Sequence, residues 1–295
     1  MTAPSQSVEL PSLRELLEKY NLRPRKELGQ HFLTDPNLLR KIVEAAELAP
    51  GAVVLEIGPG LGTLTRRLAQ VAGRVIAVEL DEAMLAVLRV EMAGLSNLEL
   101  VHGDILDLDP VALVRGPRAT PESPSPDYIV VANLPYYITS SAIRHLLEAY
   151  PPPRRLVLTV QQEVARRIVA GPGQMSLLAV GVQFYGRPRV VAKIPAGAFV
   201  PPPKVDSAVV RVDTFASSPV EVPDAQAFFR VVRAGFGQKR KQLRNSLAAG
   251  LNLPAPDVAA ALARAGIDPR RRAETLSLAE WASLAGEIGS KSRLT

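Results

Sequence analysis

The chain has 295 residues, a formal net charge of +6 and 47% hydrophobic residues, which is close to the composition of ordinary globular proteins. It has no cysteine and only three histidines, which excludes disulfide scaffolds, zinc–thiolate and iron–sulfur sites and a cysteine nucleophile. No apolar run approaches the roughly 18–20 residues of a membrane span, and the first 20 residues lack the apolar core of a signal peptide. We therefore expect a cytoplasmic protein with no metal site and no membrane anchor.

The first half of the chain alternates between short apolar runs and amphipathic helices. Residues 1–35 are expected to form an arm with one helix at 12–20, and Asp35-Pro36 is a typical helix start. Further along, 115–127 is rich in Pro, Ser and Thr and is predicted to be a mobile surface loop. We predict strands at 53–57, 75–80, 98–104, 128–133 and 155–161, with helices at 63–72, 83–93, 141–150 and 163–169. This alternation predicts an α/β fold with a mostly parallel, Rossmann-like sheet.

The pattern changes after the fifth predicted strand. Segments 188–195 and 207–213 are two apolar runs separated by a Pro-rich loop too short for a crossover helix, so they should pair antiparallel at one edge of the sheet. A linker with Pro219 and Pro223 follows, and then helical patterns continue. We predict a first domain over residues 1–213 and a small helical domain over 214–295.

A glycine loop follows the first predicted strand of the sheet. Gly58-Pro59-Gly60-Leu61-Gly62 has a Gly-x-Gly-x-Gly spacing, which differs from the Gly-x-Gly-x-x-Gly of dinucleotide sites. Glycines there let the backbone approach a ligand closely. Glu79 ends the next strand, where it could accept both hydroxyls of a ribose, and Asp104 ends the third, where it could reach an adenine amine. Singly these features fit a tight turn and two helix caps, but together they predict a nucleoside pocket.

The fourth strand ends in Asn133-Leu134-Pro135-Tyr136. An exocyclic adenine amine is a poor nucleophile because its lone pair is delocalised into the ring. An amide oxygen and a backbone carbonyl that accept its two hydrogens would localise that lone pair. Pro135 would fix the turn that aims these acceptors, and the ring of Tyr136 would stack on the base.

These motifs together resemble the S-adenosylmethionine-dependent ribosomal RNA adenine-N6,N6-dimethyltransferases of the KsgA type, over nearly the whole chain. Other segments that resemble the family are 26–33 (KELGQHFL), 161–165 (QQEVA), 199–207 (FVPPPKVDS), 236–241 (FGQKRK), 244–247 (RNSL), 266–269 (GIDP) and 272–274 (RAE). Many members have Asn where this chain has His31 and an aromatic residue where it has Leu28. The chain also has Gly173-Gln174-Met175 where the family usually has Tyr-Gly.

The resemblance implies a cofactor and site residues. S-adenosylmethionine would be the methyl donor, and the arm around Gln30 would close over it. Tyr136 and Phe199 would sandwich the target adenine next to Asn133, Leu134 and Pro135. The residues expected to line the cofactor site are His31, Leu33, Gly58, Gly60, Glu79, Asp104 and Asn133.

The net positive charge is concentrated in the C-terminal part. Residues 1–213 carry 23 basic and 22 acidic side chains, whereas 214–295 carry 12 and 7. A run without any acidic residue, which we name the basic stripe, consists of Arg230, Arg233, Lys239, Arg240, Lys241 and Arg244. A second cluster lies at 270–272. Such a stripe predicts contact with RNA phosphates, the alternative being a solvated helix face.

We therefore expect dimethylation of two adjacent adenines in small-subunit ribosomal RNA, on a pre-ribosomal particle, by a monomeric enzyme with a role in subunit maturation. One alternative is a resistance-type methyltransferase acting on large-subunit RNA, which shares the glycine, Glu and Asn-x-Pro-Tyr motifs. The presence of segment 201–207 and of Asn245-Ser246-Leu247 favours the enzyme that acts on small-subunit RNA. A ribosome-assembly or transcription factor without catalysis is a second alternative, which the intact Asn133–Tyr136 motif disfavours. The loop spacing and the lack of a hydride-transfer residue disfavour a nicotinamide dehydrogenase.

Overall fold

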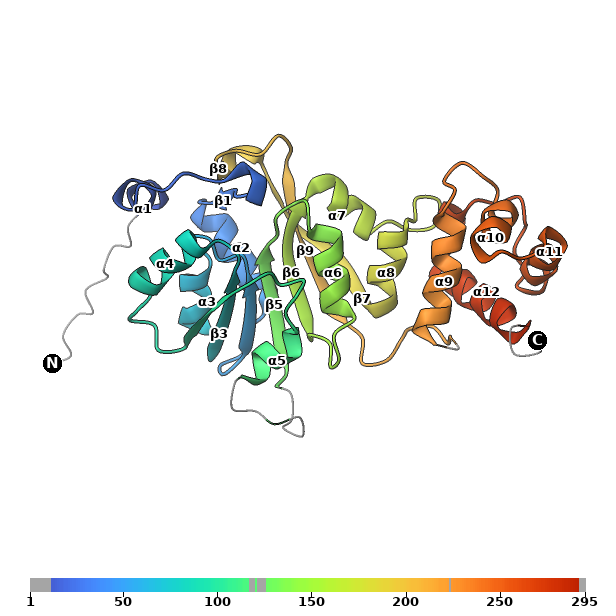
Figure 1. Ribbon diagram of the computed structural model, residues 1–295, viewed down its shortest axis with the longest axis horizontal. Helices are drawn as coiled ribbons and strands as arrows, with labels where there is room; N and C mark the ends of the chain where they lie inside the picture. The colour runs from blue at the N-terminus through green and yellow to red at the C-terminus, as the bar shows by residue number, and fades with distance from the viewer. Residues whose placement is uncertain (1–11, 117–119, 121–125, 223, 292–295) are drawn as a thin grey trace.

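A seven-stranded sheet forms the centre of the computed structural model, which describes residues 12–116, 120, 126–222 and 224–291 (Figure 1). The strand order is β4-β3-β2-β5-β6-β9-β7. The strands are β2 (Val53–Ile57), β3 (Arg74–Glu79), β4 (Leu98–His102), β5 (Tyr128–Asn133), β6 (Arg155–Gln161), β7 (Gly186–Ile194) and β9 (Ser207–Thr214). The first five pair parallel, whereas β9 pairs antiparallel with both β6 and β7. The predicted parallel sheet with an antiparallel edge is confirmed.

Both faces of the sheet are covered, because the strands are apolar on both sides. Leu55 and Ile57 face one layer of helices, while Val54 faces the other, as the two-residue period of a strand requires. Helices α5 (Pro110–Arg115), α6 (Thr139–Leu147), α7 (Gln162–Ile168) and α8 (Leu177–Tyr185) pack on the first face. Helices α2 (Pro36–Ala46) and α3 (Thr65–Val71) pack on the second, and α4 (Glu82–Glu91) contacts β3 and β4.

Two buried arginines join the end of α2 to the antiparallel edge of the sheet. Arg155 Nη1 donates to the carbonyl of Ala46 at 2.7 Å, and Arg211 Nη1 donates to that of Ala45 at 3.1 Å. Both guanidinium groups also pair with Glu47 and Asp213. The last carbonyls of α2 are thereby satisfied although the helix end is largely buried.

The N-terminal arm crosses the carboxyl edge of the sheet. It contains α1 (Leu13–Lys19), a 3-10 turn η1 (Lys26–Leu28) and the short strand β1 (Phe32–Leu33), which pairs antiparallel with β8 (Phe199–Val200). Ser12 caps α1 through a reciprocal pair of hydrogen bonds with Glu15, and Asp35 caps α2 as expected. The β1–β8 pair was not predicted, because two-residue strands leave no period in the sequence.

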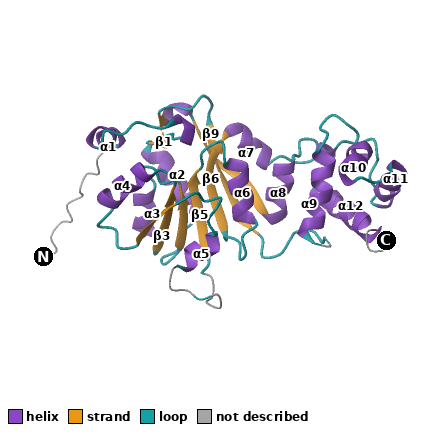
Figure 2. Cartoon of the chain, in the orientation of Figure 1, coloured by secondary structure: helices purple, strands orange, loops and turns teal. Residues whose placement is uncertain are grey.

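A C-terminal helical region lies at one end of the molecule, opposite α1 (Figures 1 and 2). It contains α9 (Ala225–Phe236), α10 (Leu243–Leu251), α11 (Ala255–Arg264), the 3-10 turn η3 (Ala273–Thr275) and α12 (Leu278–Lys291). Another 3-10 turn, η2 (Ala196–Ala198), lies outside this region and directly precedes β8. Phe228 and Trp281 are fully buried in the core of the helical region. Helix α8 also contributes Phe184 and Val180 to that core, so it packs between the two parts of the chain. The boundary at 213/214 remains a prediction; it falls at the end of β9.

The remaining differences from the predicted elements are small. Helix α5 was not predicted, although Asp109-Pro110 repeats the start signal of Asp35-Pro36. Much of the predicted loop at 115–127, and Pro223 of the predicted linker, lie outside the described residues. No helix in the described parts of the chain is both long and apolar enough to cross a membrane.

Candidate functional site

Several parallel strands end together at one edge of the sheet. Ile57 of β2 is in register with Val78 of β3 and Ala132 of β5, so the residues that follow these three positions emerge side by side. These are Gly58, Glu79 and Asn133. Crevices at the carboxyl ends of parallel strands are where this class of fold binds its ligands.

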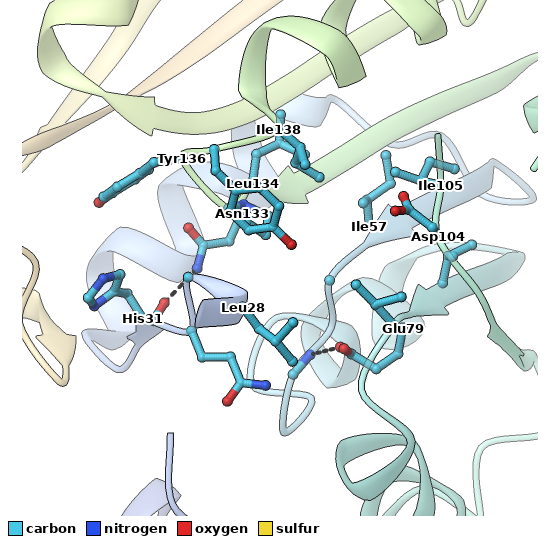
Figure 3. Close-up of a pocket in the computed structure, with 18 of the residues that line it drawn as sticks. Leu28, His31, Ile57, Glu79, Asp104, Ile105, Asn133, Leu134, Tyr136 and Ile138 are labelled. Atoms are coloured by element: carbon cyan, nitrogen blue, oxygen red, sulfur yellow. Dashed lines mark hydrogen bonds between the residues drawn. The ribbon is translucent and has the colours of Figure 1, made fainter. Parts of the chain in front are cut away.

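A pocket at this edge brings most of the predicted site residues together (Figure 3). The predicted residues that line it are His31, Gly58, Gly60, Glu79, Asp104, Asn133, Leu134, Pro135 and Tyr136. Leu28, Ile57, Ile105 and Ile138 add apolar walls. Apolar walls next to two carboxylates suit a nucleoside, since the base can lie between the walls while its sugar reaches a carboxylate.

Two glycines of the loop lie close to neighbouring parts of the site and have positive φ angles. Gly58 has φ +69°, and a Cβ there would lie 3.8 Å from the Asn133 carbonyl oxygen, in the space between the loop and the Asn133 turn. Gly60 has φ +59°, and a Cβ there would lie 2.7 Å from the Phe32 ring. Both positions therefore require glycine, the first beside the pocket and the second under the arm.

Glu79 is only 7% exposed and holds the glycine loop in place. Its Oε2 accepts from the Gly60 amide and its Oε1 from the Asp81 amide, each at 2.9 Å. Burial raises the pKa of Glu79. Each carboxylate oxygen has more than one lone pair, so Glu79 can still accept hydrogen bonds from a ribose.

We predict that Glu79→Ala weakens S-adenosylmethionine binding by about 1.5–3 kcal/mol, roughly 10- to 100-fold, because charge-assisted acceptors and the support of Gly60 are lost together. Calorimetric titration of the purified variant measures this. Glu82→Ala, which removes an exposed carboxylate on α4, is the control and should bind as the unmodified chain does. Equal affinity of the Glu79 variant and the control would refute the ribose assignment.

The side-chain amide of Asn133 has a defined orientation. Its Nδ2 donates to the His31 carbonyl at 2.9 Å, and a carbonyl can only accept, so Oδ1 is turned away from His31 (Figure 3). Among the described residues, neither this Oδ1 nor the Leu134 carbonyl accepts a hydrogen bond. The Pro135 carbonyl, in contrast, accepts from the Ile138 amide and the Thr139 hydroxyl. Asn133 Oδ1 and the Leu134 carbonyl therefore remain available as acceptors at the Asn133–Pro135 turn.

Tyr136 lies beside these acceptors. Its hydroxyl shares a 2.7 Å hydrogen bond with Ser207, and its ring stacks with that of His31 at a centroid distance of 5.8 Å. His31 Nδ1 in turn lies 2.7 Å from the Pro201 carbonyl. The imidazole therefore contacts Tyr136 and the Pro-rich loop, while the backbone carbonyl of His31 contacts Asn133.

Two predicted site residues do not line the pocket. Leu33 is 3% exposed and Phe199 is 2% exposed, and they face each other in the β1–β8 pair within the core under α2. The Leu33 carbonyl accepts from the Thr63 hydroxyl at 3.3 Å. A sandwich of adenine between Tyr136 and Phe199 would require β8 to move, and it stays a prediction.

Two residues that were not predicted support the site: Tyr137 lines the pocket, and Asp81 binds the arm residue Gln30. Asp81 is buried, caps α4 and accepts from Gln30 Nε2 at 2.8 Å, while Gln30 Oε1 accepts from the Arg25 amide. This connection holds the arm across the pocket. Tyr137 is exposed and lines the pocket next to Tyr136. The sequence signals were present, since Asp81 starts a helix two residues after Glu79.

Glu56 is a buried carboxyl two residues before the glycine loop. It is 1% exposed on the α2–α3 face of β2, and its Oε2 has no hydrogen-bond partner. Burial raises the pKa of Glu56 to about 8, and repulsion from Glu79 acts in the same direction. The folded protein therefore holds this carboxyl protonated at neutral pH.

We predict that Glu56 makes the protein less stable as the pH rises. The unfolded chain loses this proton near pH 4.5, whereas the folded chain keeps it to about pH 8. The contribution of Glu56 is therefore fully present at low pH and is lost between these values, by several kcal/mol. Glu56→Gln should flatten the pH dependence of the free energy of unfolding, measured with urea at pH 5 and pH 8.5. An unchanged difference between the two pH values would contradict the protonated state.

The basic stripe is exposed along its length and spans α9, the turn at 237–242 and the start of α10. None of its six side chains pairs with a carboxylate among the described residues. The second cluster differs, because Arg270 pairs with Asp268 at 3.0 Å and Arg271 pairs with Glu280. Of these two clusters, only the stripe consists of cations without a carboxylate partner among the described residues, and its contact with RNA stays a prediction. No group of three or more potential metal ligands occurs within the described ranges.

Known proteins resemble the chain over nearly its whole length. A family model described as "Ribosomal RNA adenine dimethylase" matches residues 21–289. The chain is 47% identical over 271 residues to "Ribosomal RNA small subunit methyltransferase A" of Dehalococcoides mccartyi (strain CBDB1), covering 92% of this chain and 90% of the relative. It is 48% identical over 271 residues to the protein of the same name from Moorella thermoacetica, covering 91% and 94%.

Two solved structures share the fold. A dimethyladenosine transferase from Plasmodium falciparum superposes with a TM-score of 0.74 at 28% identity, over 89% of this chain and 98% of that one. The 23S rRNA methyltransferase ErmE gives a TM-score of 0.67 at 31% identity, over 88% and 99%.

Proposed function

The chain belongs to the ribosomal RNA adenine dimethylase family, and from that premise we propose that it dimethylates the N6 amines of two adjacent adenines in small-subunit ribosomal RNA. The relatives at 47% and 48% identity carry a small-subunit name, whereas the 23S enzyme is 31% identical. This difference in sequence identity supports small-subunit RNA over large-subunit RNA as the substrate.

The observation that carries the proposal is the fixed Asn133 amide. Among the described residues its Oδ1 and the Leu134 carbonyl are free acceptors at this turn, and an adenine amine has two hydrogens to donate. Accepting both would draw the nitrogen lone pair out of conjugation and toward an electrophile. Tyr136 offers an aromatic face for the base next to these acceptors, and a base that reaches it must leave its stack.

The pocket residues fit S-adenosylmethionine as the methyl donor. Glu79 would accept hydrogen bonds from the ribose hydroxyls of the cofactor, and Asp104 would accept one from its adenine amine. Ile57 and Ile105 would flank the adenine ring. Asp104 Oδ1 already accepts from the Leu106 amide at 2.9 Å, which holds that carboxylate in place. Bound there, the cofactor supplies an electrophilic methyl group on a sulfonium sulfur. The chain's own contribution is to position the amine and exclude water, which is where much of the rate enhancement arises.

The proposal also gives roles to the arm and to the basic stripe, which would contact the cofactor and the RNA. The Gln30–Asp81 hydrogen bond would hold the arm over bound cofactor. The free cations of the stripe would bind RNA phosphates of a pre-ribosomal particle in the cytoplasm, with the enzyme acting as a monomer and contributing to subunit maturation.

The test uses ribosomal particles from cells that lack this gene. Mass spectrometry should find dimethyladenosine missing from their small-subunit RNA. The purified protein with S-adenosylmethionine should restore it on small-subunit particles and leave large-subunit RNA unmodified. Methylation of the large subunit instead would favour the resistance-type activity, and no methylation of either RNA would leave a binding role alone.

A further inference from the structure

A second cleft lies between the two parts of the chain, among helices α6, α7, α8 and α9. It has a cavity volume of about 250 Å³, just below the roughly 300–1,000 Å³ of small-ligand pockets. Its floor is apolar and aromatic: Leu147 of α6, Leu177 of α8, Tyr185 of α8 and Phe229 of α9. The rings of Tyr185 and Phe229 stack at 5.9 Å with an angle of 18° between them.

Three arginines surround this floor, and each comes from a different helix. Arg144 of α6 pairs with Glu148 at 2.8 Å on the same helix. Arg167 of α7 and Arg233 of α9 are exposed and pair with no carboxylate in the described part of the chain. A cleft lined both by aromatic rings and by guanidinium groups without carboxylate partners matches a nucleotide, whose base has a π face and whose phosphate is an anion.

The cleft lies between the Asn133–Tyr136 turn and the basic stripe. Along α6 it is lined at Ser140, Ile143, Arg144, Leu147 and Glu148, the spacing of one helix face. Helix α6 begins at Thr139, three residues after Tyr136. This helix face therefore starts next to the Asn133–Tyr136 turn, where the target adenine would bind. At its far side Arg233 belongs to the basic stripe. RNA that reaches both Tyr136 and the stripe would pass this cleft.

Gly181 leaves open space on the α8 side of the cleft. It lies within α8 and lines the cleft, and a Cβ built on it meets no atom within 4 Å. Its backbone is helical with an ordinary negative φ, so neither conformation nor packing requires glycine there. Glycine inside a helix costs about 1 kcal/mol relative to alanine, and here the only structural gain is open space.

We propose that this cleft is a second nucleotide subsite, in which an unstacked base of the ribosomal RNA lies against Tyr185 and Phe229 while its phosphates contact Arg167 and Arg233. The subsite rests on the proposed function for its RNA partner. It would hold the RNA strand at a fixed distance from Asn133, beyond the adenines that are modified.

Filling the cleft tests the subsite directly. Gly181→Phe should weaken binding to undermethylated small-subunit particles tenfold or more, with S-adenosylmethionine affinity and thermal stability retained. The matched control is Gly286→Phe on α12, another helical glycine whose Cβ would meet no neighbour, and it should bind as the unmodified chain does. Arg167→Gln should lower the slope of log affinity against log salt by about one. Binding of Gly181→Phe within twofold of the control, or an unchanged slope for Arg167→Gln, would overturn the subsite.

A photocrosslink identifies the occupant. With p-benzoylphenylalanine in place of Leu177, which is 40% exposed, the protein should crosslink to ribosomal RNA within the particle. A crosslink to a ribosomal protein, or none at all, would refute a nucleotide as the occupant. Failure of the proposed function has a different signature, because the unmodified chain would then not methylate small-subunit particles at all.

Discussion

Replacing Asn133 with alanine is expected to slow methyl transfer about 100- to 1,000-fold, the usual cost of removing one preorganised hydrogen-bonding group from a transition state. The reason is geometric. The His31 carbonyl holds Nδ2, so Oδ1 is already oriented before the base arrives. An alanine leaves one of the two amine hydrogens without an acceptor and leaves the nitrogen lone pair in the ring system.

Single-turnover assays with saturating cofactor measure this step separately from binding. RNA affinity should change much less than the rate, because Tyr136 and the basic stripe are intact. Asn133→Asp is the informative companion, since it keeps an acceptor but places a carboxylate against the His31 carbonyl. We expect Asn133→Asp to retain more activity than Asn133→Ala and to bind the cofactor more weakly than the unmodified chain does. A near-normal single-turnover rate for Asn133→Ala would remove Asn133 from the mechanism.

The sequence predicted most of the sheet because its strands are buried on both faces. Strands β2, β5 and β6 begin and end where predicted, since each is a mostly apolar run bounded by polar or turn residues. Because the strands are parallel, knowing their ends was enough to bring Gly58, Glu79, Asp104 and Asn133 to one edge. Motif chemistry and topology thus pointed to the same pocket.

What the sequence could not show depends on long-range pairing. The β1–β8 pair joins segments more than 160 residues apart, and it buries Leu33 and Phe199 that motif similarity had placed at the ligand. The hydrogen bond from Gln30 to Asp81 and the role of Glu79 in holding Gly60 likewise require coordinates. The cleft lined by Gly181 is of the same kind, because four helices from both parts of the chain form it.

Changing Lys239, Arg240 and Lys241 together to alanine is expected to reduce the slope of log RNA affinity against log salt by roughly two to three. All three side chains are exposed in the turn between α9 and α10, and none has a carboxylate partner within the described residues. Each phosphate contact that is lost removes one counterion-release contribution, of about 0.7–0.9 in slope. Cofactor affinity should not change, because the stripe is in a different part of the fold from Glu79.

The control for this triple variant removes the same charge elsewhere. Arg187, Arg189 and Lys193 are exposed on edge strand β7, and their joint change to alanine lowers the net charge by the same three units. If net charge alone attracted the RNA, both triple variants would weaken binding equally and neither would change the slope by two. Phosphate contact predicts instead that only the stripe variant shows the lower slope across a salt series with small-subunit particles. A parallel shift of the stripe variant's line, with its slope kept, would indicate a disturbed α9–α10 turn and would count against direct contact.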